Sequence, residues 1–340
     1  MVMVNKQMDY PYGKEFIFTV LDDTDVSTLG NIKPVYDFLY EKKIFTTKTV
    51  WPCSYSGHSD NSGSHTLEDK DYADYVRLLS DRGFEIAYHG ASMESSTREK
   101  ILLSFKIHHE VLGSYPRTYA AHAGNKDNLY WGAQRFNSRL IRFLYRNFIN
   151  KDKASNYCGH EESSAYYWGD LAKSHICYMR NLTFNSINLL KTSRCILYKD
   201  KNKPLVNSYF ITADAENVED YCALICDKNQ EKLEKERGIC ILSTHFGKGF
   251  VEDGVLHPKA RKLMESLSKR NGWFAPVCDV LDYLSSVNKG IPTIPSQSLF
   301  NLEMKWLLHA VVRRLSCRDY KRTETPYLLA SLQEASRDTD

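Results

Sequence analysis

The sequence predicts an α/β protein in which helices cover parallel strands, arranged as a barrel or as a doubly wound sheet. Short apolar runs alternate with segments of helical periodicity along most of the 340 residues. Aspartate and histidine residues follow several of these runs, at the strand ends where parallel α/β folds build their sites. With 42% hydrophobic residues, the chain can bury a sizeable core.

The first half of the chain carries the clearest alternation. An apolar run over 16–21 predicts a buried strand that ends in an acidic cluster, and residues 31–42 have the apolar spacing of a helix. A second strand over 46–51 is stopped by Pro52. The pattern then predicts a helix over 71–81, a strand over 84–88, a helix over 95–112, a strand over 118–121 and a helix over 140–148.

The pattern loosens between about 151 and 203, where aromatic and polar residues predominate and no strand can be placed. We interpret this segment as an irregular insertion. Order returns with a strand over 208–212, a helix over 219–235, a strand over 238–244, a helix over 258–269, and residues 273–277 leading into 280–287.

The chain changes character after residue 290. Prolines mark a linker, and residues 299–315 then have the pattern of an amphipathic helix, followed by a tail that we expect to be mobile. The helix carries Trp306 and several basic residues, so it could lie on a membrane surface. We prefer the alternative that it docks on the domain. The predicted division is therefore 1–290 and 291–340.

Composition excludes several classes of function. The net charge of +3 is spread without a basic run, which gives no support for nucleic-acid binding. The first fifteen residues lack the apolar stretch of a secretion signal, and no run of about 18 apolar residues predicts a transmembrane segment. Nine scattered cysteines are best explained as reduced thiols. We predict a soluble, cytoplasmic protein.

An acidic cluster stands at the end of the first predicted strand. Asp22, Asp23 and Asp25 would repel one another unless a cation or a proton lies among them, and a divalent metal is the natural partner. The alternative is that one of them caps the next helix while the others are solvated.

Three histidines follow other predicted strands in the same way, namely His89, His122 and His245. A single histidine of this kind is usually a packed residue, but repetition at several strand ends favours a shared site. Imidazole and carboxylate groups bind zinc, cobalt or iron while leaving positions open for water. Hydrolysis by a metal-activated water would follow.

Residues 20–24, Val-Leu-Asp-Asp-Thr, resemble the strand ending Thr-Phe-Asp-Asp-Gly that is the first motif of the polysaccharide deacetylases, the NodB-homology carbohydrate esterases. The resemblance extends over about 16–285 and implies a distorted (β/α) barrel of that type, here with a C-terminal helical extension. It also implies that Asp22 is the general base and Asp23 a metal ligand.

The second and third motifs match only in part. The pattern Gly-His-Glu-Ile-Gly-Asn-His-Thr-x-x-His aligns with 83–93, so His89 matches the first metal-binding histidine while the second falls on Met93, a poor ligand. The pattern Pro-x-x-Phe-Arg-x-Pro-x-Gly aligns with 116–124, where Ala120 replaces arginine and His122 replaces proline. Our hypothesis is that His122 supplies the missing ligand. A divalent metal, with zinc expected, would then be held by Asp23, His89 and His122, with Asp25 as a supplement.

The fifth motif, Leu-x-x-His, matches residues 242–245. By this resemblance His245 protonates the leaving amine, a role that suits an imidazole near neutral pH. The family also has an aspartate that holds the other nitrogen of this histidine, and Asp214 is the candidate.

Four further residues are candidates for binding the substrate. Trp51, Asn125 and Trp168 could form a sugar-binding surface, and Lys248 in a glycine-rich turn could contact an anionic group. Taken singly, each of them is better explained by a structural role.

The resemblance implies that the chain removes an N-acetyl or similar N-acyl group from a carbohydrate, free or linked to a nucleotide or a lipid. The divergent motifs resemble a cytoplasmic branch associated with O-antigen and other surface-polysaccharide biosynthesis. Two alternatives stay open. The chain could be a non-catalytic protein that binds a saccharide or a partner, or it could hydrolyse another C–N bond, such as an N-formyl group or a small cyclic amide.

Overall fold

A computed structural model describes residues 9–55, 57, 63–149 and 156–313. Within these residues a nine-stranded sheet contains seven parallel strands that close into a barrel. In spatial order they are β1 (Phe16–Asp22), β2 (Thr47–Val50), β3 (Glu85–Tyr88), β4 (Thr118–Tyr119), β5 (Tyr178–Phe184), β7 (Tyr209–Asp214) and β8 (Ile239–Thr244). β8 closes the ring by pairing with β1 from Ile17↔Ile239 to Asp22↔Thr244.

The remaining two strands extend the sheet outside the ring. β11 (Gly272–Trp273) lies parallel to β1, and β6 (Leu197–Tyr198) lies antiparallel to β7. A small antiparallel pair, β9 (Val251–Glu252) and β10 (Val255–Leu256), stands apart.

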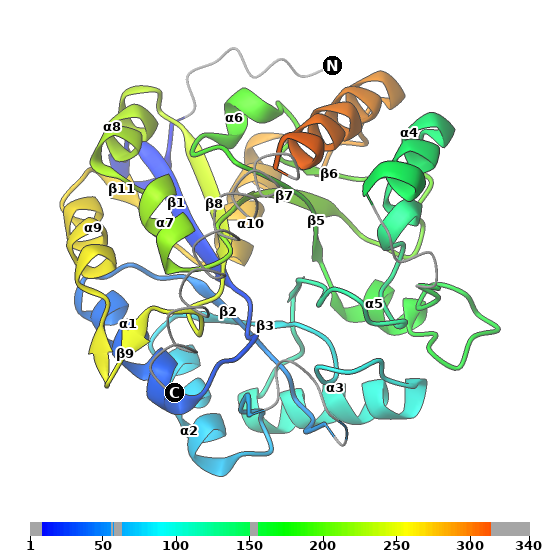
Figure 1. Cartoon of the computed structure of the whole chain (residues 1–340), viewed down its shortest axis with the longest axis horizontal. Coiled ribbons are helices and arrows are strands. Elements are labelled where there is room, and N and C mark those ends of the chain that lie inside the picture. The colour runs from blue at the N-terminus through cyan, green and yellow to red at the C-terminus, as the bar shows by residue number, and fades with distance from the viewer. Residues whose placement is uncertain (1–8, 56, 58–62, 150–155, 314–340) are drawn as a thin grey trace, which may run out of the picture.

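Helices surround the strands on the outside (Figure 1). They are α1 (Leu29–Glu41), α2 (Lys70–Asp81), α3 (Arg98–Leu112), α4 (Arg139–Leu144), α5 (Gly169–His175), α6 (Leu189–Thr192), α7 (Val218–Leu224), α8 (Asp227–Lys235), α9 (Pro258–Ser268) and α10 (Val277–Val287). Three short helical turns complete the described structure: η1 (Pro11–Gly13), η2 (Gly132–Arg135) and η3 (Tyr145–Ile149). The predicted distorted (β/α) barrel with a C-terminal helix is confirmed.

Burial explains why β1 and α1 form where they do. Every residue of β1 is buried, because the strand has barrel interior on one face and helices on the other. In α1 the buried residues include Ile32, Val35 and Leu39, which recur at helical spacing. Thr28 caps the start of the helix. Its side chain accepts from the backbone amide of Asn31, and the Asn31 side chain accepts from the backbone amide of Thr28.

The structure corrects two sequence predictions. β5 lies inside 151–203, where we predicted no strand. Arg180 and Asn181 interrupt its apolar pattern, but both side chains have hydrogen-bond partners inside the fold. The single helix predicted over 219–235 is two helices, α7 and α8. The chain breaks at Ile225 and Cys226, and Cys226 adopts the extended backbone of a helix N-cap (φ −56°, ψ 155°).

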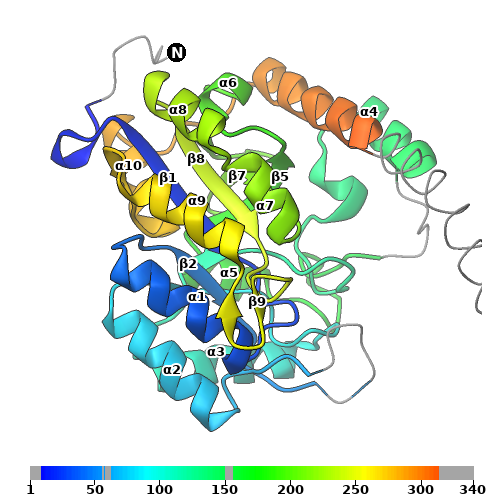
Figure 2. The ribbon, with the colours of Figure 1, turned by 60° about the vertical axis from the view of Figure 1, so that its left-hand side comes forward.

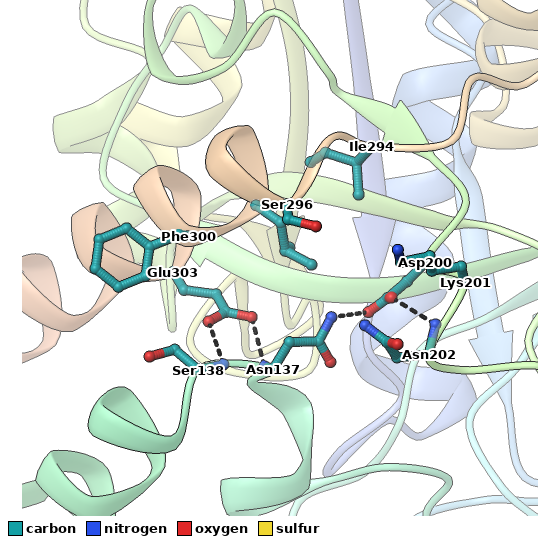
Figure 3. A pocket seen from close by; sticks show the side chains of 10 residues that line it. Asn137, Ser138, Asp200, Lys201, Asn202, Ile294, Ser296, Phe300 and Glu303 are labelled. Carbon is teal, nitrogen blue, oxygen red and sulfur yellow. Dashed lines mark hydrogen bonds between the residues drawn. The ribbon is translucent and has the colours of Figure 1, made fainter.

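A C-terminal helix, residues 296–313, docks on the barrel beside α4 (Figures 1 and 2). Its apolar face buries Leu302 and Leu307, and the ring of Trp306 lies 5.2 Å from that of Phe136. The Glu303 carboxylate accepts hydrogen bonds from the backbone amides of Asn137 (2.7 Å) and Ser138 (3.3 Å), as Figure 3 shows. The predicted tail falls in 314–340, outside the described residues. Within the described residues, no helix has the length and apolarity needed to cross a bilayer.

Candidate active site

The carboxyl ends of the barrel strands surround a cavity of about 290 Å³. Asp23, His89 and His245 follow directly after β1, β3 and β8, as expected for a parallel barrel. The lining residues are Asp23, Asp25, His89, Ala121, His122, Ala123, Trp131, Arg135, Arg180, Asn181, Thr183, Asp214, Glu216, Ser243 and His245.

Backbone contacts fix the loops after β1 and β8 against each other. The amide of Asp23 continues the β1–β8 pairing by donating to the Thr244 carbonyl (2.8 Å). The chain then turns at Val26, which has a positive φ of 52°. Gly247 packs so closely on this turn that a Cβ there would lie 2.8 Å from the carbonyl oxygen of Asp25. This close approach holds Asp25 and His245 on the same side of the cavity.

Asp25 is the centre of the site, and three imidazoles face it. Its Oδ1 lies 3.4 Å from Nε2 of His89 and 3.5 Å from Nε2 of His122, while its Oδ2 lies 3.2 Å from Nε2 of His245. The rings of His89 and His122 have centroids 5.6 Å apart. The structure therefore brings His122 next to His89.

Several buried polar atoms around Asp25 lack a hydrogen-bond partner among the described residues. They are Oδ1 of Asp23, Oδ1 of Asp25 and both ring nitrogens of His89. Burying such groups without a partner is costly, so their gathering at one point indicates a place for a further atom or molecule. The separations of 3.4 and 3.5 Å are about the spacing of two ligands with bonds of about 2.1 Å to one tetrahedral metal.

The donor chemistry thus fits a divalent cation, with carboxylate and imidazole groups on one cavity. The coordination shell is not closed as it stands. Within the described residues, no group of three or more His, Cys, Asp or Glu side chains is arranged to hold a metal ion.

Electrostatics keep Asp25 ionised. Burial would raise the pKa of this carboxyl, but interactions with His245, His89 and His122 outweigh burial and hold the pKa well below its usual range. For His245, burial acts to lower the pKa, but the hydrogen bond with Asp25 and the charges of Asp23, Asp25 and Glu216 raise it above its usual value. Burial lowers the pKa of His122, against the opposing charge of Asp25.

Arg180 of β5 is a site residue that the sequence analysis missed. Its guanidinium donates to Oδ2 of Asp23 at 2.5 Å, and also to Ser243 and to the Ala121 carbonyl. It therefore lies next to the segment in which the family pattern would have an arginine at Ala120. An arginine inside a run of buried residues was the available signal, because a buried guanidinium requires an acidic partner.

The structure contradicts the role predicted for Asp22. This residue is fully buried and does not line the cavity. Its Oδ2 accepts from Tyr36 (2.9 Å) and from Lys48 Nζ (3.0 Å), and its Oδ1 accepts from the Phe246 amide (2.8 Å). Both oxygens accept from fixed donors inside the protein, and the side chain does not reach the cavity. Asp22 holds the strand end together, and Asp23 is the carboxylate that faces the cavity.

Asp214 does not orient His245 either. Nδ1 of His245 lies 2.9 Å from the backbone carbonyl oxygen of Glu216, which is two residues further along the chain. Asp214 instead accepts from Arg313 of the C-terminal helix at 2.5 Å. Lys248 donates to the Glu216 side chain at 2.5 Å, so its ammonium is committed to that carboxylate.

The three other predicted substrate-binding residues are buried supports. Trp51 packs with its ring 5.5 Å from the rings of both His89 and His122, behind the site. Trp168 donates from Nε1 to the Asp127 carbonyl at 2.6 Å and is buried. Asn125 donates to the carbonyls of Ser92 and Glu94, joining the loops that carry the two histidines. Their buried positions leave no face on which a sugar could stack.

Comparison with known proteins gives only distant likenesses. No family model and no curated protein matches this sequence. Among solved structures, a "putative polysaccharide deacetylase" from Mycobacterium smegmatis is 13% identical and matches over 85% of this chain and 96% of its own, with a TM-score of 0.49. Puue allantoinase is 11% identical over 82% and 93%, with a TM-score of 0.47. A "probable polysaccharide deacetylase" from Pseudomonas aeruginosa PAO1 is 11% identical over 82% and 93%, with a TM-score of 0.45. Likeness at this level carries no information about activity.

Proposed function

We propose that this chain is a hydrolase that removes an N-acetyl or similar N-acyl group from a sugar. The observation that carries the proposal is the gathering of Asp23, Asp25, His89, His122 and His245 from separate strand ends on one cavity, with unpartnered buried polar atoms among them. The choice of a sugar amide rests on the motif resemblance of residues 20–24, 83–93, 116–124 and 242–245.

In this proposal Asp25, His89 and His122 would hold a divalent cation, and zinc is the expected metal. When bound, such a cation supplies polarisation of the acyl carbonyl and a lowered pKa for the attacking water. Asp23 takes the role of general base. Arg180 fixes its Oδ2, while its Oδ1 has no hydrogen-bond partner among the described residues and can accept the proton of a water.

His245 is the proposed general acid. Its Nδ1 is directed at the Glu216 carbonyl, and Nε2 lies on the cavity side, 3.2 Å from Oδ2 of Asp25. Its raised pKa favours the protonated form near neutral pH. As the C–N bond breaks, Nε2 transfers its proton to the departing amine nitrogen. The water oxygen stays on the acyl carbon, and the products are a carboxylate and an amino sugar.

The biological context of this reaction is proposed from the sequence alone. Surface-polysaccharide biosynthesis, a nucleotide- or lipid-linked carrier and a cytoplasmic location are parts of the proposal that rest on the motif pattern and on composition.

One observation favours a non-catalytic saccharide-binding protein instead. Within the described residues the ligands do not close around a metal, and Asp25 already interacts with His245. A cavity of this kind could bind a sugar without hydrolysing it.

Metal analysis combined with an acetate-release assay separates the two functions. We expect about one divalent metal per chain, reduced by His122→Ala but not by His109→Ala, which changes an exposed histidine on α3. Acetate release is measured on a panel of free, nucleotide-linked and lipid-linked N-acetyl sugars, and His245→Gln should lower it by at least about 100-fold. A metal-free chain without turnover on any member of the panel would overturn the hydrolase proposal and favour the binding-protein alternative.

A further inference from the structure

Arg135, the last residue of η2, differs from the other cations around the cavity. It lines the cavity, yet it makes no hydrogen bond or ion pair with any residue that the structure describes, and its Nε is buried without a partner. Its guanidinium carbon lies 3.5 Å from the ring centroid of Trp131 and 6.0 Å from that of Trp306. Arg135 is therefore a stacked cation whose hydrogen-bond donors are unused.

The carboxylates of the cavity do not neutralise this charge, because each of them already has its own partner. Asp23 pairs with Arg180, Asp214 with Arg313 and Glu216 with Lys248, each at 2.5 Å. Asp25 lies 3.2 Å from Nε2 of His245. Among the described residues, Arg135 is therefore a cation of the cavity lining without a carboxylate partner of its own.

Arg135 is half-buried, which makes its unpaired guanidinium costly. Burial lowers the pKa of Arg135 to about 10, and the neighbouring charge of Arg180 acts in the same direction. Stacking on an indole offsets only part of this cost, and a buried cation is normally matched by an anion.

The fold holds Arg135 in place from the side away from the cavity. Phe136 packs on Trp306. The Asn137 amide donates to Glu303 (Figure 3), so the C-terminal helix holds the two residues that follow Arg135. Gln134, which precedes it, accepts from Lys203 through its carbonyl. Because the residues on both sides of Arg135 are held by contacts, the backbone fixes where its side chain begins.

We propose that Arg135 binds an anionic oxygen group, a carboxylate or a phosphate, carried by the sugar on which this site acts. This inference rests on the proposed function and defines its substrate class as an acidic sugar. The planar guanidinium matches either group with two parallel hydrogen bonds. At about 290 Å³ the cavity is near the lower limit for small-molecule sites, so the anion and the N-acyl group must belong to one sugar unit or to adjacent atoms of its carrier.

Calorimetric titration of the full-length chain tests the proposal with three probes. They are N-acetylglucosamine, N-acetylglucosamine 6-phosphate and N-acetylmuramic acid, which are neutral, phosphorylated and carboxylated. We expect the wild type to bind at least one acidic probe about tenfold or more tightly than the neutral one, and the ratio of the two acidic probes identifies the anion. Arg135→Gln should remove the preference, and Arg135→Lys should keep part of it. Arg139→Gln removes an equal charge from an exposed position on α4 and should change nothing.

Equal affinity for acidic and neutral probes, an absence of binding by both acidic probes, or a preference that survives in Arg135→Gln would each overturn the inference. Circular dichroism melting shows whether each variant is folded, and the charge-conserving Arg135→Lys supplies the comparison if Arg135→Gln is not. Acetate release measured on the same samples separates the two proposals. An Arg135-dependent preference without acetate release refutes the hydrolase alone, while acetate release with the same KM in wild type and Arg135→Gln refutes the acidic-sugar inference alone.

Discussion

Arg180 of β5 and Asp23 at the end of β1 form a buried ion pair, with Nη1 and Oδ2 2.5 Å apart. The two residues lie on strands that are not neighbours in the barrel, so the pair spans its carboxyl end. It fixes one oxygen of Asp23 and leaves the other for the cavity.

Removing this arginine should destabilise the fold, because a buried carboxylate would lose its partner. We expect Arg180→Met to lower the free energy of unfolding by about 3 kcal/mol in urea titrations. The double variant with Asp23→Asn should regain part of this loss, since the unpaired charge is then gone. Arg139→Met, at an exposed position, is the control. If the double variant is no more stable than Arg180→Met, the pair does not contribute through its charge.

Substitution of the two adjacent aspartates by asparagine should have different effects: mainly on stability at Asp22 and mainly on activity at Asp23. Asp22→Asn leaves the fully buried Lys48 without its carboxylate, so stability should fall by roughly 3 kcal/mol while activity per folded molecule changes less than about tenfold. Asp23→Asn should lower activity by about 100-fold or more, with the proposed general base lost. Urea titration and acetate release are measured on both variants. A larger loss of activity in Asp22→Asn would restore the role that the sequence pattern implied.

His108 should make the fold sensitive to acid. Burial lowers its pKa to about 4, against about 6.5 in an unfolded chain. Between these values the unfolded chain binds a proton that the folded chain does not, so stability is fully present above pH 6.5 and is lost as the pH falls towards 4. His108→Asn, whose amide can still donate to the Ser114 carbonyl, should reduce the difference in unfolding free energy between pH 7 and pH 4.5 by about 2 kcal/mol. The charge of the exposed neighbour His109 contributes only a small part of the low pKa of His108, so His109→Asn should change that difference much less than His108→Asn does.

Glu303 should be the main polar anchor of the C-terminal helix. Glu303→Ala removes the acceptor for the Asn137 and Ser138 amides, and we expect a loss of about 1–2 kcal/mol in thermal or urea unfolding. Glu303→Gln keeps one carbonyl acceptor and should lose less. Ser298→Ala, on an exposed position of the same helix, serves for comparison. An unchanged stability in Glu303→Ala would mean that the apolar contacts of Trp306 hold the helix by themselves.

The sequence predicted β1, β7 and β8 from their apolar runs. β5 was missed because its polar residues are matched by partners on distant strands, and no local pattern records such a match. The break between α7 and α8 was missed for a related reason. Periodicity continues across Cys226, and only the observed backbone shows a new helix start.

Within the site, spacing predicted which strand ends converge but not which side chain faces inward. Asp22 and Asp23 are adjacent at the end of a strand, so their side chains point to opposite sides and a shift of one residue would exchange which of them faces the cavity. The buried ion pair with Lys48 keeps Asp22 in the core. The same uncertainty of one or two residues led to Asp214 instead of Glu216 as the contact of His245. The distance between His89 and His122 depends on the loops that carry them. The sequence suggested that the two residues are close, but only the structure gives their separation.

The closing pair of the barrel, β1 with β8, also joins the two halves of the site. Asp25 comes from the start of the chain and His245 from far along it, so a refolding molecule cannot bring them together before its first and last ring strands meet. Contacts between residues so distant in sequence form late, because a long loop must close first. Recovery of ligand binding should therefore lag behind recovery of the helical circular dichroism signal. A bound ligand should also slow the separation of β1 from β8.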